Sequence, residues 1–140
     1  MSEEQTVTYE LDGEIALVGL NRPDKRNAVN GDLAAALDWI VKDTEANPDI
    51  RVVILASTSD GAFSAGADLS EISKGRGHTL STADGGFGGL ARARREKPWI
   101  AAVDAERRRK HDDLQTRLRE KRATVGVIGL GYVGLPLAVS

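Results

Sequence analysis

The chain has 140 residues, of which 41% are hydrophobic and 29% are charged, and its formal net charge is −2. This balance predicts one modest soluble globular domain and argues against a disordered chain or a membrane protein. The absence of cysteine and the isolation of His78 and His111 exclude disulfides, thiol chemistry and a His-based metal cluster. The sequence starts with acidic residues, which argues against a signal peptide, and it has no apolar run long enough for a membrane helix. We therefore expect a cytoplasmic protein.

The first half of the chain predicts a hairpin followed by a helix. Two β-rich runs at residues 6–11 and 15–20 flank Asp12-Gly13, which is a strong hairpin signal. Asn30 can cap a helix of about 17 residues that stops at Asn47-Pro48. Its apolar positions follow helical spacing: Leu33, Leu37, Ile40, Val41 and Thr44.

The middle of the chain predicts two buried strands separated by loops. Residues 51–57 and 98–103 are apolar runs of strand length, as expected where both faces of a sheet are covered. After the first strand comes a loop of small residues that leads into a short helical stretch at 69–72. We expect a mobile Gly-rich loop at 73–89 and a short basic helix at 90–96.

The character of the chain changes after residue 104. Residues 1–104 carry 11 Lys/Arg and 17 Asp/Glu, a net charge of −6, whereas residues 105–140 carry 8 and 4, a net charge of +4. Such asymmetry indicates a boundary. The charged run 105–122 predicts a crossover helix that brings the apolar strand 124–128 parallel to the strand at 98–103. Without that partner, the exposed edge of the latter strand predicts association or aggregation.

Two motifs lie in the loops that follow predicted strands. Residues 21–30 read NRPDKRNAVN, and residues 62–72 read AFSAGADLSEI. Peptide N–H groups at the start of the second motif's short helix can meet an anion or a polarised carbonyl oxygen. Taken singly, the first motif is equally well a basic surface turn, and the second is a small-residue turn in which Asp68 caps the helix.

In this order and spacing, the two motifs closely resemble the start of the crotonase (enoyl-CoA hydratase/isomerase) superfamily, from about Val7 to Asp104. The resemblance implies an α/β fold, a spiral of ββα units, that binds acyl-CoA thioesters, needs no further cofactor and forms trimers or pairs of trimers. It implies that the backbone N–H of Ala67 is one of two donors to the thioester oxygen; losing such a donor costs about 10²–10³ in rate. The residues implied to line the CoA site are Lys25, Arg26, Asn27, Ala28, Ala65, Gly66, Asp68 and Leu69.

The sequence departs from that family after residue 104. Crotonases continue with a glycine, which supplies the second donor, and with one or two catalytic glutamates; here the chain reads AERRRK at 105–110. Glu106 and Glu120 lie in a solvated charge run, so we assign no catalytic acid or base. The basic run itself favours a solvated helix face over a nucleic-acid surface, because acidic residues interleave with it and aromatics are absent.

A third motif, Gly129-Leu-Gly131-Tyr-Val-Gly134, follows the apolar strand at 124–128. Its glycines would let a pyrophosphate sit on a helix N-terminus. Residues 124–139 closely resemble the opening of the NAD-dependent nucleotide-sugar dehydrogenases, with 114–122 similar to the helix that precedes it. The acidic residue expected about 20 positions further on falls beyond Ser140, so we do not expect this piece to hold NAD.

We therefore predict a partial crotonase-like domain at 1–104, a charged helix or linker at 105–123 and a partial Rossmann-like βα start at 124–140. Three functions stay open. The first is an enoyl-CoA hydratase-type lyase, impaired by truncation. The second is a non-catalytic CoA-binding or association fragment, and the third is a remnant of a nucleotide-sugar dehydrogenase. The expected ligand is an acyl-CoA, and no metal, membrane or nucleic-acid partner is expected.

Overall fold

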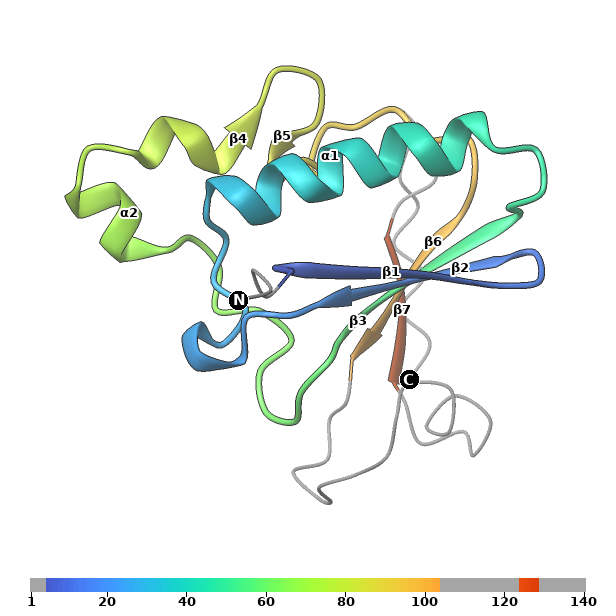
Figure 1. Ribbon diagram of the computed structural model, residues 1–140, viewed down its shortest axis with the longest axis horizontal. Helices are drawn as coiled ribbons and strands as arrows, with labels where there is room; N and C mark the ends of the chain where they lie inside the picture. The colour runs from blue at the N-terminus through green and yellow to red at the C-terminus, as the bar shows by residue number, and fades with distance from the viewer. Residues whose placement is uncertain (1–4, 104–123, 129–140) are drawn as a thin grey trace.

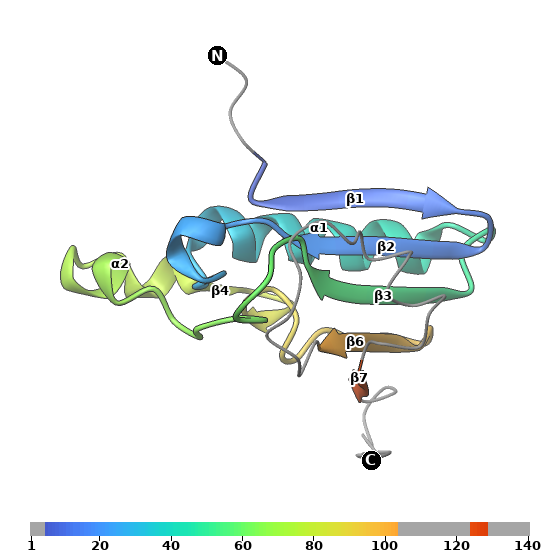
Figure 2. The same cartoon turned by 90° about the horizontal axis from the view of Figure 1, so that it is seen from below.

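A computed structural model describes residues 5–103 and 124–128 of the chain. The described part contains a five-stranded sheet in the order β1-β2-β3-β6-β7, with α1 lying across one face (Figures 1 and 2). The strands are β1 (Val7–Asp12), β2 (Ile15–Leu20), β3 (Val52–Ser57), β4 (Ser81–Thr82), β5 (Gly86–Phe87), β6 (Trp99–Val103) and β7 (Thr124–Ile128). The helices are η1 (Pro23–Lys25), α1 (Gly31–Ala46), α2 (Leu69–Ser73) and η2 (Gly77–Leu80), and none of these is long and apolar enough to cross a bilayer.

The predicted hairpin and the two predicted strands at 51–57 and 98–103 are confirmed. β1 and β2 pair antiparallel from Val7 opposite Leu20 to Asp12 opposite Ile15. Gly13 takes a φ of 59° in the connecting turn, a conformation that glycine adopts without steric cost. β3 pairs in parallel with β2 and with β6, which explains why its apolar residues are not interrupted by polar ones.

Helix α1 begins and ends as its sequence predicts. The Asn30 side chain accepts a hydrogen bond from the Leu33 N–H at 3.0 Å, and the helix ends at Ala46, before Pro48. Its buried face carries Leu33, Ala34, Leu37, Ile40, Val41 and Thr44. The apolar residues of this face pack against a core that includes Val18 and Val53 of the sheet, and each large side chain contributes about 1.5–3 kcal/mol.

The predicted pairing of residues 124–128 with β6 is confirmed, but its direction is wrong. β7 runs antiparallel to β6, with Trp99 opposite Ile128 and Val103 opposite Thr124. An antiparallel neighbour needs no crossover connection, so the reason for expecting a crossover helix at 105–122 falls away. That segment itself lies outside the described residues.

Two further predictions for the middle of the chain are wrong. Residues 73–89 contain η2 and the small β4–β5 hairpin rather than a structureless loop. Residues 90–92 form a turn and residues 93–96 are irregular, so the predicted basic helix is absent. There the backbone N–H of Glu96 donates to the Glu45 carboxylate on α1 at 2.9 Å, so a long-range side chain takes the place of a helical hydrogen bond.

Candidate functional site

The two motif loops lie side by side, beyond the ends of β2 and β3. Val29 and Ala67 form a parallel β-bridge. The Val29 N–H donates to the Gly66 carbonyl at 2.7 Å, and the Asp68 N–H donates to the Val29 carbonyl at 2.9 Å. The Ala65 N–H donates to the Arg26 carbonyl at 2.9 Å. The structure therefore joins the two loops that the sequence singles out.

The bridge leaves the Ala67 N–H available. Because Gly66 and Asp68 both bond to Val29, the N–H and C=O of the residue between them point away from that partner. In the described part of the chain, the Ala67 N–H meets no hydrogen-bond acceptor. A preorganised peptide donor of this kind can stabilise negative charge that develops on a carbonyl oxygen.

The buried side chain of Asn27 holds the first loop in place through hydrogen bonds. Its side chain is fully buried and its Nδ2 donates to Ser57 Oγ at 2.9 Å and to the Phe63 carbonyl at 3.0 Å. Its Oδ1 accepts from the Arg22 N–H at 2.8 Å. The resemblance implies that Asn27 lines the CoA site. In the structure its side chain makes hydrogen bonds to other parts of the protein. Its φ of 54° also suits asparagine better than most residues.

The other predicted residues of the first loop differ in exposure. Lys25 and Arg26 are exposed, whereas Ala28 is buried. Arg26 lines a pocket of about 460 Å³ together with Pro23 and residues 59–62. The loop therefore presents two cationic side chains to solvent.

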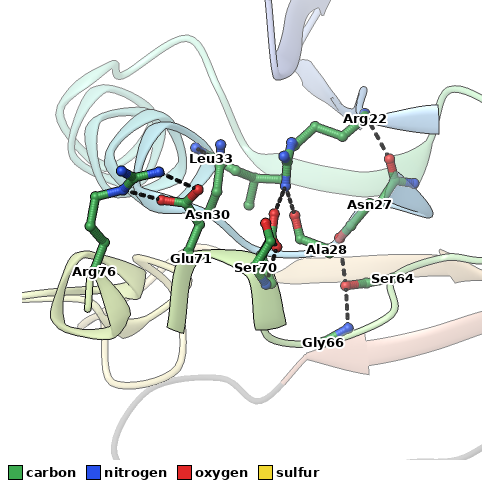
Figure 3. A network of polar contacts seen from close by, with 11 residues as sticks. Arg22, Asn27, Ala28, Asn30, Leu33, Ser64, Gly66, Ser70, Glu71 and Arg76 are labelled. Carbon is green, nitrogen blue, oxygen red and sulfur yellow. Dashed lines mark hydrogen bonds and ion pairs between the residues drawn. The ribbon is translucent and has the colours of Figure 1, made fainter. Parts of the chain in front are cut away.

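In the second loop, Ala65 and Leu69 are exposed, and Ala67 is half-buried. Gly66 has a φ of 83°, which favours glycine at this turn. Ser64 stabilises the turn, because its Oγ donates to the Asn27 carbonyl at 2.8 Å and accepts from the Gly66 N–H at 3.2 Å (Figure 3). The backbone of this loop is thus fixed while its outer surface stays open.

The Asp68 carboxylate makes contacts within the protein that stabilise the second loop. It caps α2 by accepting from the Ser70 N–H at 3.0 Å and from Ser70 Oγ at 2.7 Å, and it forms an ion pair with Arg22 Nη1 at 3.1 Å. The Ser70 hydroxyl, followed by Arg22, lowers the pKa of Asp68 from 3.8 to about 2. This carboxylate is ionised at neutral pH and is too weak a base for proton abstraction.

Arg22 is the residue of this region that the sequence reasoning missed. Its Nη1 donates to the Ala28 carbonyl in the first loop (Figure 3). The same nitrogen donates to Asp68 Oδ2 in the second loop. The sequence shows an arginine in one motif and an aspartate in the other, but nothing in it indicates that two residues 46 positions apart form a pair.

No group of three or more His, Cys, Asp or Glu side chains in the described residues could hold a metal ion.

The predicted dinucleotide turn at Gly129, Gly131 and Gly134 lies outside the described residues, as do Glu106 and Glu120. Their placement therefore stays a prediction.

A comparison with protein families matches residues 10–106 to the enoyl-CoA hydratase/isomerase family. Among curated proteins, a short-chain-enoyl-CoA hydratase of Clostridium acetobutylicum is 35% identical over 109 residues, covering 73% of this chain and 40% of the relative. A probable enoyl-CoA hydratase of Rhizobium meliloti is 39% identical over 102 residues, covering 71% of this chain and 38% of the relative.

Solved structures show the same relationship. A carnitinyl-CoA hydratase from Mycobacterium avium has a TM-score of 0.67 and 37% identity, covering 71% of this chain and 39% of that chain. An enoyl-CoA hydratase from Mycobacterium tuberculosis H37Rv has a TM-score of 0.65 and 31% identity, covering 71% and 38%. The chain thus spans about two fifths of the length of these relatives.

Proposed function

Because the chain belongs to the enoyl-CoA hydratase/isomerase family, we propose that it binds an acyl-CoA thioester along the paired loops 25–28 and 65–69. Lys25 and Arg26 are exposed cations that suit the phosphates of CoA. The neighbouring small residues let the ligand approach the backbone closely.

The observation that carries this proposal is the unpaired backbone N–H of Ala67 in the described part of the chain. It has no acceptor among the described residues, and the bonds on either side of it fix its direction. In the proposed complex it donates to the thioester oxygen. That bond strengthens as negative charge accumulates on the oxygen, so it favours enolate formation over the ground state.

Proton transfer needs groups that we do not assign. Adding water to an enoyl thioester, or moving its double bond, requires an acid or base at the reacting carbons. Asp68 is the acidic side chain next to Ala67, but Ser70 and Arg22 already hold it as the carboxylate. We therefore propose binding and thioester polarisation for the described loops, with hydratase or isomerase turnover as a separate question.

Isothermal titration calorimetry with crotonyl-CoA tests binding directly. Saturable heat is expected, and free crotonate without CoA should give none, because the loops address the CoA part of the ligand. The absence of saturable heat with both crotonyl-CoA and CoA would contradict the proposal. A hydration assay on the same sample then measures turnover independently of binding.

Two predictions from the sequence stand beside this proposal: homo-oligomerisation and a dinucleotide-binding turn. Light scattering tests the first, for which the family resemblance implies trimers or pairs of trimers. The dinucleotide turn is less favoured than acyl-CoA binding, since β7 pairs antiparallel with β6, whereas a dinucleotide-binding sheet is mostly parallel.

A further inference from the structure

We propose that Arg22 is a positioning residue that clamps the two loops together and so holds the Ala67 N–H in the direction of the thioester oxygen. The proposal rests on the function proposed above for Ala67. In the proposed complex Arg22 acts through Ala28 and Asp68 and makes no contact of its own with the acyl-CoA.

The contacts of a single guanidinium nitrogen support the clamp. Arg22 Nη1 donates to the Ala28 carbonyl and lies 3.1 Å from Asp68 Oδ2. Ala28 immediately precedes Val29, and Asp68 immediately follows Ala67, so the two contacts flank the bridge between those residues. The Ala28 contact fixes the guanidinium within the first loop, and the Asp68 contact reaches the second. Separation of the loops would therefore break the Arg22–Asp68 contact together with the bridge.

Burial strengthens the attraction between Arg22 and Asp68. The side chains of Arg22 and Asp68 are 15% and 7% exposed, respectively. Water and salt screen such a pair less than one on the surface. Among the residues that the structure describes, removal of the arginine would leave the nearly buried Asp68 carboxylate with Ser70 as its one remaining partner.

Both ends of the clamp are anchored. The Arg22 N–H donates to Asn27 Oδ1, and Asn27 in turn is tied to Ser57 at the end of β3. At the other end, Ser70 holds the Asp68 carboxylate at the start of α2. The clamp therefore positions the second loop relative to the sheet, and not only relative to the first loop.

A second arginine provides a matched control. Arg76 makes two hydrogen bonds to Glu71, at 2.7 and 2.8 Å, but its side chain is 51% exposed and both residues belong to the same short segment. This pair does not connect the two loops. Arg76→Gln thus removes an arginine–carboxylate pair without touching the clamp.

Amide hydrogen exchange on the ligand-free chain tests the clamp itself. In Arg22→Gln and Asp68→Asn, the Val29 amide should exchange about tenfold faster or more, because the bridge opens more often. Arg76→Gln should leave this rate unchanged. Arg22→Lys should fall in between, since lysine keeps the charge but lacks the planar fork, and it serves if Arg22→Gln does not fold.

Infrared difference spectroscopy tests the positioning of the donor. With a crotonyl-CoA labelled with ¹³C at the thioester carbonyl, binding to the unchanged chain and to Arg76→Gln should lower the carbonyl stretching frequency. At saturating ligand, Arg22→Gln should lose at least half of this shift, and Arg22→Lys should recover part of it. A merely structural arginine would leave the shift of the bound ligand intact.

The outcomes separate the two proposals. A full carbonyl shift in Arg22→Gln, or an unchanged Val29 exchange rate, overturns the clamp. Loss of binding with unchanged exchange also overturns it, since Arg22 would then be a ligand contact. Loss of binding with accelerated exchange supports it. If the unchanged chain binds no acyl-CoA, the proposed function fails, and if Val29 exchange responds as expected the clamp stands as a loop-joining contact only.

Discussion

Asn27 Nδ2 lies 2.9 Å from Ser57 Oγ, so the loop that carries the cations Lys25 and Arg26 is fastened to the carboxyl end of β3. The same asparagine also bonds to the Phe63 carbonyl and to the Arg22 N–H. A buried side chain with three such partners has few tolerable replacements.

Asn27→Ala should therefore destabilise the chain by about 2–4 kcal/mol. The substitution leaves buried partners unsatisfied and puts alanine at a positive φ. Urea unfolding followed by circular dichroism measures the change. Lys25→Ala, at an exposed position of the same loop, should change stability by less than about 0.5 kcal/mol. Equal effects of the two substitutions would contradict the bracing role of Asn27.

Loss of the exposed cations should weaken acyl-CoA binding. Lys25→Ala and Arg26→Asn are each expected to raise the Kd roughly threefold, as an exposed charge contact contributes about 0.2–1 kcal/mol. Asparagine suits position 26 because φ is 49° there. Calorimetry in 50 and 300 mM NaCl should show the difference shrinking with salt. Lys74→Ala, at the exposed C-terminal end of α2, is the control and should bind like the unchanged chain.

The low pKa of Asp68 predicts how stability depends on pH. The Ser70 hydroxyl and Arg22 lower this pKa from 3.8 to about 2 in the folded chain, so folding favours the ionised form. That contribution is present above about pH 4 and is lost as pH falls toward 2. The stability advantage of the unchanged chain over Asp68→Asn should thus be largest near neutral pH and shrink over this range. Thermal melts between pH 2 and 7 would show it, and a constant difference would argue against the ion pair.

Gly89 should tolerate no side chain. A Cβ there would lie 2.2 Å from the Ala34 carbonyl oxygen and 2.7 Å from the Asp38 nitrogen, both on α1. Gly89→Ala is expected to cost about 3 kcal/mol or more, since the helix backbone cannot yield. Gly75→Ala separates this clash from backbone strain, because Gly75 has a similar φ of 75° but open space around it. It should cost about 1 kcal/mol. Denaturant midpoints of the two variants give the comparison.

Local signals in the sequence were sufficient for much of this fold. The Asp12-Gly13 turn, the Asn30 cap and the helical spacing from Leu33 to Thr44 each act over a few residues, and each element forms where those signals predict. The two motif segments also form loops after β2 and β3, as the sequence predicts. In the second loop, glycine permits the positive φ of Gly66.

The errors arose where distant residues decide the structure. Residues 90–96 have helical composition, but Glu45 on α1 accepts from the backbone N–H groups of Glu96 and Lys97. The apolar run at 124–128 specifies a strand without specifying its direction, and the antiparallel register with β6 is a tertiary choice. The Arg22–Asp68 pair likewise depends on the tertiary contact between two loops that are far apart in the sequence.

The span of 46 residues between Arg22 and Asp68 also bears on how the site comes into being. Both α1 and β3 lie between these residues in the sequence, so the contact has a high sequence separation and closes a long loop at a cost in entropy. Neither loop excised as a peptide would retain the direction of the Ala67 amide. Affinity for an acyl-CoA should consequently disappear in the same cooperative transition as the parallel pairing of β2 with β3, which makes ligand binding a probe of folding for this chain.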